Sequence, residues 1–141
     1  MSPARGMAVA VAASLALILA GSAFAGAIDP ARSTVGNSAR LNASATAVRL
    51  DGVVYCATCR RFTLGATVSQ SRSGALGQGG VRCVCRAARE HWVLTARTRE
   101  ATRFKPGAAR VCVWIIARGS RGKAIDAAQW CENVTLRPAE A

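Results

Sequence analysis

The 141-residue sequence is poor in acids, in histidine and in aromatic side chains, and these shortages exclude several kinds of function. Seven aspartates and glutamates and a single histidine, His91, leave few groups for acid–base chemistry. No Gly-x-Ser-x-Gly motif occurs, and none of the acids forms an obvious pair along the chain. We therefore expect a protein that is not an enzyme and that uses no cofactor and no metal.

Aromatic residues make up only 5% of the chain, so the domain has little bulky side-chain surface for its core. The length allows one small domain once an export signal is removed. Six cysteines are present, and in an oxidising compartment they can supply stability as disulfides.

The first 25 residues have the layout of a secretory signal peptide. A basic start with Arg5 precedes the apolar run 7–20 and small residues that end in Ala23-Phe24-Ala25, after which we predict cleavage. Gly21 and Ser22 interrupt the apolar run before the roughly 20 residues that a membrane span needs. We expect a secreted or cell-envelope protein with no transmembrane span after cleavage.

The mature chain divides into a predicted flexible segment, one domain and a short tail. Residues 26–45 are rich in Gly, Ala, Ser and Asn without a periodic pattern, which indicates a flexible N-terminal segment. We expect the ordered domain over 46–138 and a disordered C-terminal tail over 139–141. Within the domain, 71–80 has the composition of a loop, and 123–129 is the only helix-like stretch, too short to be stable alone.

Alternation of apolar and polar residues predicts several short strands. The expected strands are 62–69, 81–86, 91–99, 111–118 and 130–136. The strand 111–118 is apolar on both faces, so we place it in the centre of the sheet. With these five, a total of six or seven short strands at this spacing predicts an all-β fold, a small immunoglobulin-like antiparallel β-sandwich stapled by disulfides.

Two of the cysteines form a predicted pair. Cys112 lies on the face of its strand opposite Val111 and Val113, and Cys131 lies on the corresponding face of the following strand. A bridge between them closes an interval of about 20 residues and would stabilise the domain by roughly 3 kcal/mol.

The other four cysteines are Cys56, Cys59, Cys83 and Cys85. We expect two disulfides that join the first two to the last two, and the spacing leaves open which sulfur meets which. One alternative is a zinc site built from all four thiolates, although the second pair has one intervening residue where a zinc knuckle has two. Another is a redox dithiol at Cys56 and Cys59, which normally needs a helix after the first cysteine, whereas 60–70 is predicted as a strand.

Arginine accounts for 17 of the 19 basic residues, and the formal net charge is +12. Arg82, Arg86, Arg97 and Arg99 fall on or between neighbouring predicted strands and are the candidate anion-binding residues. For an exported protein the expected partner is an anionic envelope polymer, or a protein, and not nucleic acid. The simpler interpretation, favoured by composition alone, is a solvated surface from a GC-rich coding sequence.

From about Leu50 to Pro138 the chain resembles the small secreted immunoglobulin-like domains of unknown function found in GC-rich actinobacteria. The residues that carry this resemblance are Cys56 before Phe62-Thr63-Leu64, Val68-Ser69-Gln70, Cys85 before Trp92–Ala96, Arg103–Ala109 and Gln129–Leu136. The resemblance implies a β-sandwich with one bridge like Cys56–Cys85 and another like Cys112–Cys131, and Cys59–Cys83 would be an additional pair. These are also the pairings that we prefer among the four clustered cysteines.

A shorter stretch is similar to the pollen Ole e 1 and extensin family. The matching residues are Val54–Arg60 and then Leu64–Val68. Ala57 stands where that family usually has Asp, and the cysteine expected soon after Val68 is absent.

Overall fold

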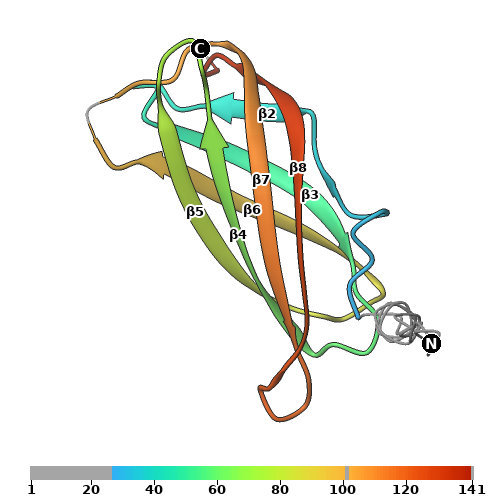
Figure 1. Cartoon of the computed structure of the whole chain (residues 1–141). Coiled ribbons are helices and arrows are strands. Elements are labelled where there is room, and N and C mark those ends of the chain that lie inside the picture. The colour runs from blue at the N-terminus through green and yellow to red at the C-terminus, as the bar shows by residue number, and fades with distance from the viewer. Residues whose placement is uncertain (1–26, 101, 141) are drawn as a thin grey trace, which may run out of the picture.

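The computed structural model describes residues 27–100 and 102–140, which form an all-β domain without a helix (Figure 1). The strands are β1 (Thr34–Val35), β2 (Ser38–Leu41), β3 (Ala47–Tyr55), β4 (Arg61–Ser69), β5 (Leu76–Val84), β6 (Arg89–Thr98), β7 (Gly107–Arg118) and β8 (Ala124–Arg137). The predicted export signal, 1–25, lies outside the described residues. Among the described residues, no helix has the length and apolar character needed to cross a membrane.

Seven strands form a closed ring in the order β3-β2-β8-β7-β4-β5-β6, because β6 also pairs with β3. The long strands β5, β4, β7 and β8 make one layer, and β3 and β6 cross behind them at an angle (Figure 1). The prediction of an all-β fold is confirmed. A sandwich keeps its two sheets apart, whereas here two residue pairs between β5 and β6, and the short β2 between β3 and β8, join the layers into a barrel.

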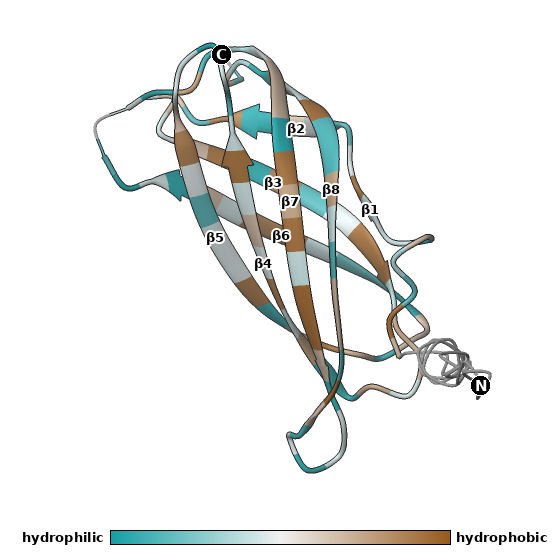
Figure 2. Cartoon of the chain, viewed as in Figure 1, coloured by the Kyte–Doolittle hydropathy of each residue, from teal (hydrophilic) through white to brown (hydrophobic). Residues whose placement is uncertain are grey.

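The core comes from the predicted alternation, which places every second residue inside the ring. Phe62, Leu64 and Val68 on β4 are fully buried, and Trp92 on β6 is 1% exposed. Apolar bands along the strands alternate with polar ones in Figure 2. The core is therefore filled by a few large aromatic side chains that are surrounded by valine, leucine and alanine.

Strand β7 lies between β4 and β8, as its two apolar faces predicted, but only one of those faces is covered. Val111, Val113 and Ile115 point inward and are fully buried, whereas Trp114 points outward and is 43% exposed. The reason is that the barrel has one interior, and no described segment packs on the outside of this layer.

The prediction that 26–45 is flexible is wrong for its described part, which contains β1 and β2 and contributes buried side chains to the core. The backbone N–H of Ile28 donates to Asp126 Oδ2 at 2.9 Å, and that of Val35 donates to Glu132 Oε2 at 2.5 Å. These bonds link the segment to the inward side of β8. Charge-assisted bonds of this kind are about twice as strong as neutral ones, so they hold a segment that lacks a long apolar pattern.

Three smaller boundaries also differ from the predictions. The expected loop 71–80 is half strand, because β5 begins at Leu76 and pairs with β4 throughout its length. The helix-like stretch 123–129 belongs almost entirely to β8, where pairing with β7 overrides its local composition. In the expected tail, Glu140 forms an exposed ion pair with Arg40 at 3.3 Å.

Candidate anion-binding face

The outward side of β5, β4, β7 and β8, called the front face below, carries basic side chains and no acidic ones. Strands β4, β5 and β7 contain no Asp or Glu at all. The two acids of β8, Asp126 and Glu132, lie on its inward side, where they bind the N-terminal segment. The basic residues of the front face are Arg61, Arg82, Arg110, Arg118 and Arg137.

Like charges stand directly opposite each other on this face. Arg61 of β4 is the register partner of Arg118 of β7, an arrangement that destabilises a sheet unless an anion lies near. The Arg118 guanidinium donates to the Gly122 carbonyl at 3.0 Å, which orients it without neutralising it. Within the part of the chain that the structure describes, the one salt bridge joins Arg40 to Glu140, away from this pair. The front face therefore presents uncompensated positive charge.

An open hollow of about 540 Å³ lies where the front face meets β6. It is lined by Gly79 and Gly80, which we call the glycine floor, and by Ala66 and Trp114. Polar and basic residues complete the lining: Thr67, Gln78, Arg97, Thr98 and Arg99. The hollow thus combines an exposed aromatic ring with two guanidinium groups and amide and hydroxyl groups, which suits a polar, negatively charged ligand.

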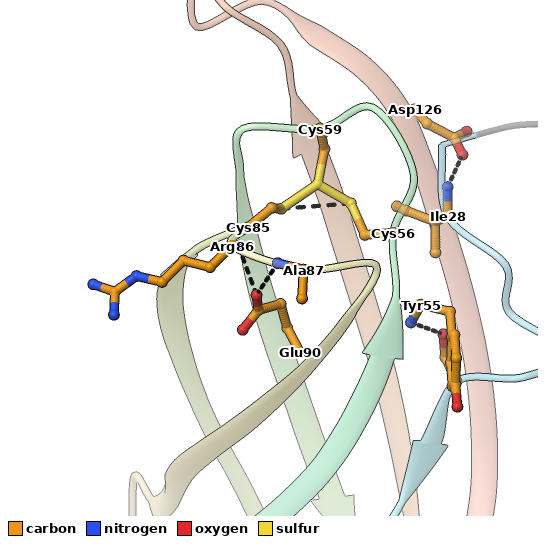
Figure 3. Close-up of a disulfide and its surroundings, with 10 residues drawn as sticks. Ile28, Tyr55, Cys56, Cys59, Cys85, Arg86, Ala87, Glu90 and Asp126 are labelled. Carbon is orange, nitrogen blue, oxygen red and sulfur yellow. Dashed lines mark hydrogen bonds between the residues drawn. A yellow bond between two sulfur atoms is a disulfide. The ribbon is translucent and has the colours of Figure 1, made fainter.

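The structure divides the four predicted anion-binding arginines. Arg97 and Arg99 line the hollow together, because Arg97 pairs with Gln78 of β5. Arg82 lies nearer the opposite end of β5, on the front face. Arg86 follows β5, and its side chain points away from the neighbouring sulfurs (Figure 3), while its backbone N–H donates to Glu90 Oε1 at 2.6 Å.

Sequence reasoning missed Arg61, Arg118 and Trp114 as members of this surface. The two arginines are far apart in the sequence and meet only through the β4–β7 register. A usable signal for Trp114 was present, because the strand 111–118 is apolar on both sides and a barrel of this size buries only one of them.

The structure joins Cys112 to Cys131 across β7 and β8. The two residues are direct register partners, and both side chains lie on the front face. This bridge ties together the two strands that form the longest hairpin of the domain.

Three other sulfurs meet at the opposite end of the barrel from the chain's C-terminus. The Cys59 sulfur lies between those of Cys56 and Cys85, at bonding distance from both (Figure 3). One sulfur forms one disulfide, so Cys56–Cys59 and Cys59–Cys85 are alternative bridges, and each leaves one thiol. In the chain-entropy model the bridge to Cys85 stabilises by about 3.5 kcal/mol and the short one by about 2 kcal/mol, because the longer loop loses more entropy.

Cys83 stands apart from these three sulfurs and is a free thiol. The structure thus does not join Cys59 to Cys83, and it places Cys56 and Cys85 sulfurs 3.5 Å apart without a bond. Burial, and to a smaller extent the Glu90 carboxylate, raise the pKa of the Cys83 thiol above its ordinary value. The ligand atoms of Cys56, Cys59 and Cys85 lie within 4.8 Å of one another, so the described cluster offers three thiolates to a metal where a structural zinc site uses four.

No protein-family model and no curated protein matches the chain. Among solved structures, the chain is similar to the Pseudomonas fluorescens alkylpurine DNA glycosylase AlkC bound to DNA containing an abasic site analog. The two share 16% identity with a TM-score of 0.38, and the match covers 86% of this chain and 33% of that one. Fold and site together define the chain as a disulfide-containing all-β barrel with one basic face.

Proposed function

We propose that the protein is a secreted or envelope-associated binding module, without catalysis, whose front face binds an anionic polymer. The observation that carries this proposal is the segregation of charge on β4, β5, β7 and β8, where arginines point outward and the two acids point inward. A field of one sign attracts a polyanion over a long distance and holds it through several contacts.

The separation of the acids from the arginines is not explained by a GC-rich coding sequence. A GC-rich coding sequence raises arginine throughout a protein, but it does not govern where the acids lie. Here Arg61 opposes Arg118 directly, at a cost to the folded state that a bound anion removes. Binding to a polyanion therefore explains this arrangement of charges, whereas composition does not.

Export is part of the proposal and rests on the predicted signal peptide together with the disulfides, which persist in oxidising compartments. We also retain as a proposal the relation to small secreted immunoglobulin-like domains. The two crossed layers support it, and the closed ring distinguishes this chain from a standard sandwich.

The salt dependence of binding tests the proposal. We expect the oxidised protein to bind polyphosphate, a polyanion of simple structure, and not the neutral polymer dextran. Its affinity should fall at least about tenfold between roughly 50 and 200 mM salt, because several arginine contacts each release counterions. Binding that is independent of salt, or equal for both polymers, would contradict the electrostatic mechanism.

A further inference from the structure

We propose that Trp114 and the glycine floor beside it form a stacking site for a sugar ring, so that the polyanion recognised is an acidic polysaccharide. This inference rests on the proposed function and deepens it, because it names the chemical class of the polymer. The ring of one uronic acid unit would lie against the indole, and its carboxylate would face Arg97 or Arg99 in the hollow.

The indole ring of Trp114 lies against a glycine on the neighbouring strand. A Cβ added to Gly65, its register partner on β4, would lie 2.2–2.4 Å from three atoms of the indole ring. The ring therefore lies over the backbone of β4, which only glycine permits at this position. An aromatic side chain held in this way offers a preformed surface and loses little conformational freedom when a ligand stacks on it.

Gly80 continues the floor on the next strand, where a side chain would meet a single backbone atom of the protein. Gly65 is the register partner of both Trp114 and Gly80, so the three positions lie in one row across the front face. A Cβ at Gly80 would meet only the Leu64 carbonyl, at 3.3 Å, whereas one at Gly79 would clash with the Thr95 backbone at 2.1 Å. Glycine within a strand is unfavourable, and it often marks a place where a ligand or another backbone approaches closely.

The surrounding groups match an acidic sugar better than a chain of bare phosphates. Gln78 and Thr67 supply an amide and a hydroxyl that can bond to sugar hydroxyls, and they lie in the adjacent row of the sheet. The planar fork of the Arg97 guanidinium fits a carboxylate through two parallel hydrogen bonds. A polyphosphate has no ring to stack on Trp114 and uses the charge alone.

The experiment compares two polyanions on the oxidised full domain, polygalacturonate and polyphosphate, with variants Trp114→Ala and Gly80→Val. We expect each variant to weaken binding of polygalacturonate by about tenfold, because the stacking surface is lost or covered. Binding of polyphosphate should change less than about twofold, since the arginines remain. Val93→Ala, which trims a side chain that is also 43% exposed but lies on β6 away from the hollow, is the matched control and should change neither.

The outcomes separate this inference from the function on which it rests. If both variants bind polygalacturonate as the unmodified protein does, or lose both polymers equally, the stacking site is refuted while salt-dependent binding stands. If the unmodified protein binds neither polymer, the proposed function fails as well. Circular dichroism identifies misfolding, and Gly80→Val, which removes no aromatic contact, keeps the test valid if Trp114→Ala is unstable.

Discussion

The front face and the back face of the barrel differ although both are built from an arginine-rich sequence. The back face, the outward side of β3 and β6 apart from Arg97, which lines the hollow, carries Arg49 and Arg89 together with the half-buried Asp51. At one end of this face the Arg32 guanidinium lies over the Tyr55 ring, 4.1 Å from its centre. The front face is uncovered, and all of its charged side chains are basic. If the proposed function holds, the placement of a few acids, more than the number of arginines, decides which surface attracts anions.

The two acids of β8 bind the N-terminal segment. Asp126 and Glu132 point inward from β8 and accept hydrogen bonds from the backbone of the segment that leads into β1. They therefore hold this segment against the inward side of β8 and leave the front face without negative charge. The front layer is held differently, by the Cys112–Cys131 bridge across β7 and β8.

Removing the front bridge should have the largest effect on stability. The double substitution Cys112→Ala/Cys131→Ala is expected to lower the free energy of unfolding by about 3 kcal/mol, because the unfolded chain regains the entropy of a loop of about 20 residues. Thermal unfolding without reductant should then shift by about 10 °C or more. An unchanged melting temperature would show that the bridge does not hold the front layer.

Weakening the attachment of the N-terminal segment to β8 should have a smaller effect on stability. Glu132→Gln keeps an oxygen acceptor for the Val35 N–H and for Trp130 Nε1, which donates at 3.2 Å, but removes the charge. The expected loss is about 1 kcal/mol, and the Val35 amide should exchange with solvent faster. Hydrogen exchange and denaturant unfolding measure the two quantities.

Glu140→Gln is the matched control for Glu132→Gln, because it removes an acid whose ion pair with Arg40 is exposed. An exposed pair contributes about 0.5 kcal/mol or less, so this variant should remain close to the unmodified protein. If the two substitutions had the same effect, the inward acids of β8 would have no special role in fastening the segment.

Much of the barrel could be predicted from the sequence because its interior and exterior contrast strongly. The alternation of 62–69 and 91–99 identified β4 and β6 and their buried residues. The short strands β1 and β2 could not be found in this way, since they have two and four residues. The Val35 N–H of β1 bonds to Glu132, 97 residues away, and β2 pairs with β3 and with the distant β8, and such contacts leave no local pattern.

The candidate site was predictable only in part for a related reason. The arginine content and the candidates Arg97 and Arg99 were visible in the sequence, and the structure places these two in one hollow. The opposition of Arg61 to Arg118, and the row that joins Trp114 to Gly80, exist only once the register of β4 is set. A sequence without its strand pairing cannot show which residues share a row.

A matched charge reversal on the two faces tests the central claim most directly. Arg61→Glu/Arg82→Glu alters the front, and Arg49→Glu/Arg89→Glu makes the same change in net charge on the back, all four being exposed strand positions. With affinity for polyphosphate measured at about 0.1 M salt, the front pair should weaken binding about thirtyfold or more, from roughly 1 kcal/mol per lost contact, and the back pair about twofold or less. Equal losses from the two pairs would mean that net charge alone governs binding and that the front face is not the site.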